Sequence, residues 1–465
     1  MIKLKQLIIP LILILGLLHG NMVFSAAAAK RRMGKSSTTN HHYSERAIKV
    51  FNEVWQEICK RNFDKNLAHK FKNKITAKYL PLAKKCRDDH ELAQLLNRMI
   101  KELGQSHIGV MPPISSSYNQ ALNVSRRNRQ RPRLKPIKPI KLQKPKNPSK
   151  PINGIMADVP ADIGLIPCTI DDKLYVLQLR KGFPAKQAGI KLGEEIIAID
   201  DVKLTPDKPA PVSWGRIVSM MLSGYPGTVV KLTLRHHNGK LYSLELVRRT
   251  NGFKWFKLGV MPKFFSEFEA KVLPGEIGYI RFSAFLPEEI TKISRVINHE
   301  LKDSHGLIID LRDNVGGIIL ATQWLAGWLY NKPVPIGSLK MHGATLKPVS
   351  YPQTNGYRQP LVILVNDGSY SCAELFPAAM QDAQAAKIFG SPTQGKCLPS
   401  QFIILPSGFR LQTVFGDHFR TTGKRVEGIG VTPDFSVKLD LKTLQKGQDS
   451  VIEAAREYLL KLHNH

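Results

Sequence analysis

Apolar residues recur at helical spacing through the first folded part of the chain. Between Tyr43 and Leu103 they include Ala47, Val50, Phe51, Val54, Trp55 and Ile58, followed by Leu92, Leu95, Leu96, Met99 and Ile100. Steps of three and four residues put such side chains on one face of a helix. The run ends in LGQSHIGVMPP, where Gly104 can close a helix and two prolines stop any continuation. We therefore predict a helical N-terminal domain over residues 40–112.

The hydrophobic pattern changes twice after that domain. Residues 154–250 hold short β-branched and apolar runs separated by glycines, which is typical of a small, β-rich module. In residues 251–441 the strand-like runs IGYIRF, GLIIDL and LVILV alternate with helical patterns, as in an α/β domain with a largely parallel sheet. Residues 442–465 are predicted to form a C-terminal helix. The fold class is thus a multidomain α+β protein whose sites should lie at the C-terminal ends of its parallel strands.

The segment between the first two predicted domains cannot contribute to a core. Residues 113–153 include SRRNRQRPRLKPIKPIKLQKPKNPSKP, a basic, proline-rich linker and the most concentrated source of the net charge of +31 on 465 residues. Such a segment is solvated and semi-extended. Its charge would attract an anionic membrane or an envelope polymer, whereas nucleic acid is not the expected partner, and a plain spacer explains it equally well.

Residues 1–27 have the features of a secretory signal peptide. Lys3 and Lys5 precede an apolar run from Leu7 to Leu18, and small residues follow. An uncleaved anchor is the alternative, although Pro10 interrupts a run that is short for a span of about 20 residues. We expect export to a bacterial periplasm, with inner-membrane association or secretion as alternatives.

Three junctions in the last domain have the composition of an acyl-transfer site. GLIIDLRDNVGGIILA places Gly316 and Gly317 between a buried strand and a helix, where free backbone N–H groups could hold an oxyanion or simply form a tight turn. LVILVNDGSYSCAELF puts Ser371 at a helix start, as a nucleophile, as an N-cap in a capping box with Glu374, or as both. GSPTQGKCLPS supplies Lys396, a candidate base if its amine is desolvated.

Together these junctions resemble the carboxy-terminal processing, or tail-specific, serine peptidases. The turn GSYSCAE matches the family's GSASASE-like turn with Ser371 in the nucleophile's place, and Lys396 follows 25 residues later, as the family's lysine base does. The resemblance implies an oxyanion hole formed by the N–H of Gly317, with Gly316 adjacent, and by that of Cys372. It also implies protein substrates with exposed C-terminal tails.

The sequence departs from the family at the base. The family continues Lys-Gly-x-Val-Gln, with the glutamine orienting the lysine, but Lys396 is followed by Cys-Leu-Pro-Ser-Gln, so that Ser400 or Gln401 would have to substitute. Moreover, GQSHIGV resembles a loop of the tricorn-type peptidases, which implies a tetrad of Ser371 with Ser106, His107 and Glu427. A Ser371–Lys396 dyad is our first interpretation and the His107 arrangement is the alternative.

The module at residues 154–250 resembles a PDZ domain. The matching features are PAKQAG and GEEI within VLQLRKGFPAKQAGIKLGEEIIAIDDVKL. Such domains bind a terminal carboxylate with backbone N–H groups and take up the peptide at a sheet edge. The resemblance implies that Ile163-Gly164-Leu165 is the carboxylate loop and that Val218 and Leu222 line a peptide pocket, although such apolar residues could instead fill the module's core.

The chain has five cysteines, an odd number that cannot all pair within one molecule. Cys59 and Cys86 fall in the same predicted domain and are the ordinary candidates for a disulfide. Cys372 and Cys397 each follow a candidate site residue, so with the dyad they could come within about 7 Å and form a regulatory disulfide. No metal-ligand cluster, phosphate loop or nucleotide fingerprint is evident, so we expect no cofactor. Two other functions fit the sequence, a catalytically inactive PDZ adaptor and a protein that binds anionic polymer or membrane through its linker.

Overall fold

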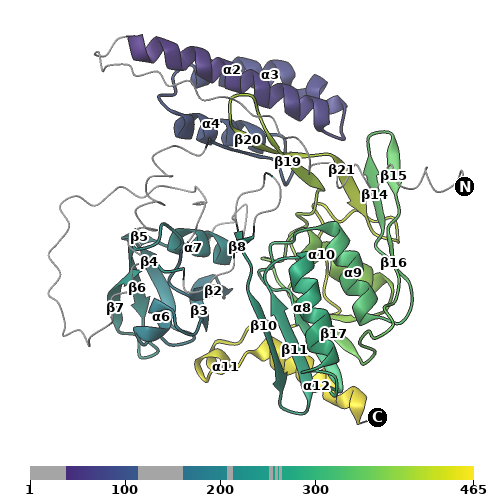
Figure 1. Cartoon of the computed structure of the whole chain (residues 1–465). Helices are drawn as coiled ribbons and strands as arrows, with labels where there is room; N and C mark the ends of the chain where they lie inside the picture. Colours follow the sequence, from purple (N-terminus) through teal and green to yellow (C-terminus); the bar gives the residue numbers. More distant parts are fainter. Residues whose placement is uncertain are drawn as a thin grey trace, which may run out of the picture.

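The structure is a computed structural model that describes residues 38–113, 161–206, 213–250, 255–256, 260 and 264–464 (Figure 1). The predicted signal peptide and, apart from Pro113, the predicted linker lie outside the described residues. The protein is a mixed α/β structure with several separate sheets, which confirms the fold prediction at that level. No helix among the described residues is long and apolar enough to cross a membrane.

The N-terminal part consists of α2 (Thr38–Arg61), α3 (Asn66–Ala83), α4 (Asp89–Lys101) and the short strand β1 (Gly109–Met111). The Asp88 side chain caps α4 by accepting the N–H groups of His90 and Glu91. The apolar positions at helical spacing form one core, which also contains Leu405, Phe409 and Leu411. Those three residues belong to the hairpin of β19 (Ser400–Ile404) and β20 (Arg410–Val414).

The hairpin brings two distant parts of the chain together. Strand β1 pairs antiparallel with β20, with Val110 opposite Leu411. The core of the N-terminal helices is therefore completed by a hairpin some 300 residues later in the sequence. As a result, the GQSHIGV loop just before β1 is held against the C-terminal half of the protein.

Residues 161–250 form a separate antiparallel sheet with two helices. Its strands are β2 (Leu165–Ile170), β3 (Lys173–Leu179), β4 (Glu195–Ile199), β5 (Val202–Lys203), β6 (Val229–Arg235) and β7 (Leu241–Val247), and its helices are α6 (Pro184–Gln187) and α7 (Trp214–Leu222). The strand order is β2-β3-β4-β6-β7, with β5 beside β4, so β2 lies at one edge and α7 packs against it. We call residues 161–250 the β module; its assignment as a PDZ domain stays a prediction. The short strands β8 (Trp255–Phe256) and β9 (Phe264–Phe265) pair with each other after it.

The largest unit is built on a six-stranded sheet. Its order is β10 (Phe268–Leu273), β11 (Ile277–Phe282), β12 (Gly306–Asp310), β17 (Leu361–Val365), β18 (Lys387–Gly390) and β22 (Phe435–Ser436). Only β10 runs antiparallel to its neighbour, and the other four pairings are parallel. Smaller sheets at its margin contain β13 (Val334–Pro335), β14 (Ser338–Met341), β15 (Ala344–Leu346), β16 (Val349–Ser350) and β21 (Gly416–Phe419).

Helices cover both faces of this sheet. On one face α8 (Pro287–Asn298), α9 (Ile319–Leu329) and α10 (Cys372–Asp382) share the main apolar core (Figure 1). On the other face α12 (Ser450–His463) packs on a second cluster, and the short α11 (Leu441–Gln445) precedes it. The strands β12 and β17 are buried along their whole length, which explains their unbroken apolar sequences. Their C-terminal ends lead directly into the glycine pair and the Ser371 turn.

Candidate active site

Ser371 occupies a strained turn between β17 and α10. Its backbone has φ 56° and ψ −118°, a conformation that non-glycine residues rarely adopt. The side chain is partly exposed at the end of the strand, as the sequence predicted. The backbone N–H of Ser371 donates to the carbonyl oxygen of Lys396 at 2.9 Å. The Ser371 turn is therefore hydrogen-bonded to the loop that carries the candidate lysine base.

The buried carboxylate of Glu374 makes a second connection between the same two loops. It accepts hydrogen bonds from the hydroxyl of Thr393 at 2.6 Å and from the N–H groups of Gly395 and Lys396 at 2.6 and 2.7 Å. A longer contact of 3.3 Å joins it to the N–H of Ser371. Burial raises the pKa of Glu374 to about 7, while these donors act in the opposite direction. The sequence suggested only a capping role for this residue.

The glycine pair lies against the nucleophile. Gly316 has φ 81°, and a Cβ there would come within 2.5 Å of the Cβ of Ser371 and 2.9 Å of the nitrogen of Cys372. The N–H of Gly316 is already used, because it donates to the side chain of Asn314 at 2.8 Å. In contrast, the N–H groups of Gly317 and Cys372 have no acceptor among the described residues. Two unused backbone donors beside a serine hydroxyl are the arrangement that an oxyanion requires.

Ser106, His107 and Glu427 form a hydrogen-bonded chain. The hydroxyl of Ser106 lies 2.8 Å from Nδ1 of His107 and donates to Glu427 at 2.9 Å. Glu427 also accepts the N–H groups of Ser106 and Cys397, at 3.2 and 2.8 Å. Because the Ser106 proton points to the carboxylate, Nδ1 of His107 must be the protonated nitrogen. Nε2 then carries the free lone pair, which is the form of imidazole that can act as a base.

The surroundings of His107 keep its ring neutral. Burial, followed by the nearby cations Arg216 and Lys396, lowers its pKa to about 4. His107 itself has φ 57°, so its loop is held in an uncommon conformation. A neutral imidazole near the Lys396 loop, and therefore near the Ser371 turn, can accept a proton at any pH above about 4.

Lys396 is positioned by its backbone rather than by its ammonium group. Its carbonyl and N–H bind Ser371 and Glu374, while Nζ makes no hydrogen bond to any described residue. The proposed substitutes for the orienting glutamine lie on β19, where Ser400 accepts a hydrogen bond from Gln412. Neither Ser400 nor Gln401 is hydrogen-bonded to Lys396. The geometry therefore orients His107 more completely than Lys396.

Tyr370 and Arg216 connect the β module to the candidate site. The hydroxyl of Tyr370, beside the nucleophile, accepts the N–H of Ser213 at 3.2 Å and donates to Gln394 at 3.3 Å. The guanidinium of Arg216, on α7, lies 4.8 Å from the centre of the Tyr370 ring. Neither residue stood out in the sequence, because their roles depend on how the module docks on the core.

The predicted peptide-binding residues are placed differently from the expectation. Ile163, Leu165, Val218 and Leu222 are all buried and belong to the core of the β module, so they do not line an open groove in this structure. The N–H of Gly164, in the predicted carboxylate loop, donates to the side chain of Asp162 at 2.8 Å. A terminal carboxylate could use this N–H only after Asp162 has moved away.

All five cysteines are free thiols in this structure, so neither candidate disulfide is formed. Cys372 and Cys397 are buried in different apolar clusters. Burial raises the pKa of Cys372 to about 11 and that of Cys397 well above its usual value. Both are therefore protonated near neutral pH, a form that does not favour oxidation.

Comparison with known proteins identifies the unit that contains this site. Residues 276–437 match the family model described as Peptidase family S41. The chain carries an S41 peptidase domain. This domain runs from β11 to β22 and contains Gly317, Ser371, Lys396 and Glu427, whereas Ser106 and His107 precede it.

Curated relatives are carboxy-terminal processing proteases. The chain is 27% identical over 275 residues to the chloroplastic carboxyl-terminal-processing peptidase 3 of Arabidopsis thaliana, which covers 56% of this chain and 50% of that protein. It is 26% identical over 277 residues to the carboxy-terminal-processing protease of Bartonella bacilliformis, covering 57% of this chain and 58% of the relative. The chain thus spans little more than half the length of these relatives.

Solved structures share the fold. The photosystem II D1 C-terminal processing protease matches with a TM-score of 0.50 at 21% identity, covering 87% of this chain and 98% of that one. Mature CPAF matches with a TM-score of 0.56 at 14% identity, covering 91% and 97%. The tricorn protease matches with a TM-score of 0.51 at 18% identity, covering 91% of this chain and 37% of that one. The matches extend beyond the S41 domain to most of the chain.

Proposed function

We propose that this protein is a serine endopeptidase that hydrolyses peptide bonds of protein substrates through an acyl-enzyme on Ser371. The observation that carries the proposal is the pair of unused N–H groups, from Gly317 and Cys372, beside a serine on a strained strand-to-helix turn. The S41 domain and the processing-protease relatives support the same chemistry.

The proposed mechanism uses these groups in the following order. The Ser371 oxygen attacks the scissile carbonyl and gives its proton to Nε2 of His107, while the developing oxyanion is held by the two N–H groups. His107 then returns the proton to the leaving amine as the C–N bond breaks. Water repeats the sequence on the acyl-enzyme, releasing the acid and regenerating Ser371. Ser106 and Glu427 hold the ring in the tautomer that these transfers need.

The experiment that tests this proposal is cleavage of an unstructured protein with an apolar C-terminal tail. Cleavage is expected from the chain without residues 1–27 and should be absent in Ser371→Ala. With His107 as the base, His107→Ala should lose about 10³-fold or more in kcat/KM, whereas Lys396→Met should keep measurable activity. The reverse pattern would make Lys396 the base, as in our first interpretation of the sequence.

A matched control is His299→Ala, because His299 is exposed at the end of α8 and far along the chain from the site. It should cleave like the unmodified protein. Undiminished cleavage by Ser371→Ala would contradict the proposal. A chain that cleaves no tail at all, yet binds tails, would instead support the adaptor function.

We further propose that the β module selects substrates by their C-terminal tails. The edge position of β2 beside α7 is the support, since an extended peptide can add to such an edge. Tail binding must displace Asp162 from the N–H of Gly164. Asp162→Ala in the Ser371→Ala background should therefore bind a free-acid tail peptide more tightly, and the amidated peptide should show no such gain. Equal gains for both peptides would contradict carboxylate recognition.

We also propose that the protein is exported and that its basic linker binds anionic surfaces. Export should give a mature chain without residues 1–27, which N-terminal sequencing of the protein recovered from a cell envelope would test. Binding to vesicles of anionic lipid should weaken steeply with salt and disappear when residues 113–153 are deleted.

A further inference from the structure

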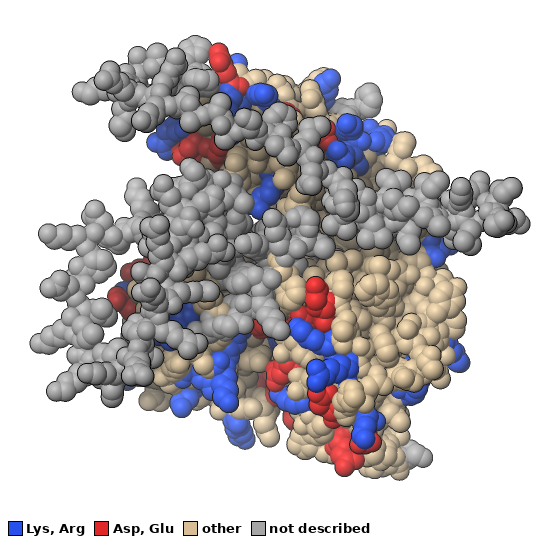
Figure 2. All heavy atoms as spheres, in the orientation of Figure 1, with Lys and Arg blue, Asp and Glu red and all other residues tan. Residues whose placement is uncertain are grey.

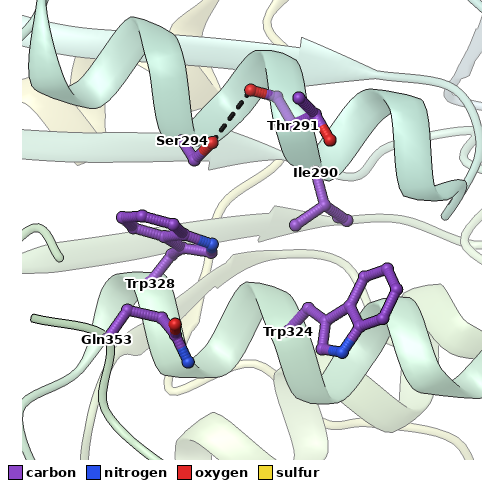
Figure 3. Close-up of a pocket in the computed structure, with 6 residues that line it drawn as sticks. All are labelled: Ile290, Thr291, Ser294, Trp324, Trp328 and Gln353. Atoms are coloured by element: carbon purple, nitrogen blue, oxygen red, sulfur yellow. Dashed lines mark hydrogen bonds between the residues drawn. The ribbon is translucent and has the colours of Figure 1, made fainter. Parts of the chain in front are cut away.

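A pocket of about 300 Å³ lies between α8 and α9, and no residue of the Ser371 turn lines it. It is lined by Ile290, Thr291, Ser294, Trp324, Trp328 and Gln353, and the two tryptophan rings border it from α9 (Figure 3). Neither the mechanism nor the sequence motifs use these residues. We call this pocket, with the adjoining Leu320, the tryptophan groove.

The groove continues along one face of α9. Leu320, Trp324 and Trp328 are four residues apart, so they follow one another on the same side of the helix. Leu320 and Trp324 are 38% and 43% exposed, so this side of α9 presents apolar surface to the solvent. Figure 2 shows few Lys, Arg, Asp or Glu side chains over α9, whereas charged side chains gather on the side of α8.

The lining of the groove selects for apolar groups. The hydroxyl of Thr291 donates to the carbonyl of Pro287, and that of Ser294 donates to the carbonyl of Thr291, so both donors are used within α8 (Figure 3). The Gln353 amide donates to the carbonyl of Tyr351 at 3.3 Å. What remains for a ligand is mainly aromatic and aliphatic surface.

The helices that line the groove begin beside the glycine pair. Phe285, just before α8, pairs with Gly317, just before α9: its N–H donates to the carbonyl of Gly316 at 2.8 Å, and its own carbonyl accepts from Ile318 at 2.9 Å. Both helices therefore begin beside the glycine pair and run away from it together. With a rise of 1.5 Å per residue, Trp324 and Trp328 lie roughly 10 and 16 Å from Gly317 along the helix.

An extended polypeptide covers about 3.3 Å per residue, so those distances correspond to about three to five residues of substrate. We propose that the tryptophan groove is a substrate subsite. It binds an aromatic or large aliphatic side chain that lies three to five residues before or after the scissile bond. This inference rests on the proposed peptidase function and adds the substrate class that the site prefers.

The test compares a set of long peptide substrates with one short peptide that has the same residues around the scissile bond. The long peptides carry one Phe at the third, fourth or fifth position on either side, and the short peptide ends before those positions. In the unmodified protein the best long peptide should have the higher kcat/KM, and Trp324→Ala or Trp328→Ala should reduce the long-to-short ratio about tenfold, a typical loss for a buried aromatic anchor. The control Leu462→Ala, 46% exposed on α12, should leave this ratio unchanged.

The subsite proposal would be overturned if the tryptophan variants lowered kcat/KM equally for the long and short peptides, or did not lower it for the long peptide. A separate measurement keeps the subsite and the peptidase function apart: binding of the fluorescent long peptide to Ser371→Ala, with and without Trp324→Ala. Tryptophan-dependent binding without any cleavage by the unmodified protein would support the groove and contradict the peptidase. Analytical ultracentrifugation tests whether a second copy of the chain covers the groove. If the protein is a dimer that Trp324→Ala dissociates, the proposal fails.

Discussion

At the scale of single residues, Glu374 is the side chain that connects the Ser371 turn to the Lys396 loop. Its two oxygens accept from Thr393, Gly395 and Lys396 at 2.6–2.7 Å and from Ser371 at 3.3 Å. The amide of a glutamine has only one accepting oxygen, so Glu374→Gln leaves part of these donors without a partner. A hydrogen bond to a charged group contributes about 1.5–3 kcal/mol, so kcat/KM should fall about 10- to 100-fold.

The measurement is steady-state hydrolysis together with the thermal midpoint of unfolding. Glu453→Gln is the control, because Glu453 pairs only with Arg456 on the surface of α12. It should change neither quantity appreciably. Full activity in Glu374→Gln would show that the connection between the loops is not needed for the chemistry.

The pH at which activity falls on the acid side, which we call the acid limit, should reflect the pKa of His107. Its pKa of about 4, set first by burial and then by Arg216 and Lys396, means that the ring becomes protonated only near that pH. As the base must be neutral, kcat/KM should decline as the pH falls through about 4 rather than through 6.5. Removing a cation favours the protonated ring, so Arg216→Gln should move this limit upward. It should not reach 6.5, because burial remains.

The position of the acid limit is the readout, since Arg216→Gln also removes the contact with Tyr370 and can lower the plateau. Lys292→Gln, which removes a cation paired with Glu289 on α8, is the matched charge control. If Arg216→Gln lowered kcat/KM at every pH but left the acid limit at the same pH, His107 would not be the group whose protonation sets that limit.

At the scale of elements, the strand-to-helix turns are shaped by glycine at one decisive position. Gly316 has φ 81°, and a Cβ there would lie 2.5 Å from Ser371 Cβ and 2.7 Å from the carbonyl oxygen of Tyr370. Gly316→Ala should therefore displace the nucleophile and reduce kcat/KM by about 100-fold or more, because a shift of about 1 Å is enough for such a loss.

Gly423→Ala provides the control for backbone strain alone. Gly423 has the same φ of 81° but no atom within 4 Å of an added Cβ. Both variants should lose about 1–2 kcal/mol of stability from the left-handed conformation, measured by denaturant unfolding. Only Gly316→Ala should lose activity. Equal activities in the two variants would mean that the close approach of Gly316 to Ser371 has no catalytic consequence.

Local patterns explain which elements could be predicted from sequence. The buried strands before Gly316 and Ser371 are continuous apolar runs, and the turns that follow them have distinctive residues, so both junctions could be located from the sequence alone. The pairing of β1 with β20 could not, because the partners are about 300 residues apart and three-residue strands carry little signal. The Ser106–His107–Glu427 contacts depend on that pairing, and so they were only suggested by resemblance. The exposure of Trp324 could not be predicted from the sequence, because the helix that carries it has apolar residues on every side.

At the scale of the whole molecule, the β module is attached to the core by an ion pair of Arg180 with Glu267 and at two further places. One is the contact of Ser213 and Arg216 with Tyr370, next to the nucleophile. The other is the C-terminal segment, where Leu444 on α11 is buried against the outer face of β2 and β3, in a cluster with Ile166, Cys168, Ile170, Tyr175 and Leu177. The module is thus held both beside the site and by the last part of the chain.

The second attachment can be weakened without touching the site. Leu444→Ala should remove about 2–5 kcal/mol of packing free energy, the usual cost of this truncation in a core. Because the cluster joins α11 to β2 and β3, hydrogen exchange of the amides in these two strands should become faster, while exchange in β12 and β17 should stay as it is. Leu462→Ala, on the exposed side of α12, should alter neither pair of strands. If β2 and β3 kept their protection from exchange, α11 would not be what holds the module, and its orientation would depend on the contacts at Tyr370 and Glu267.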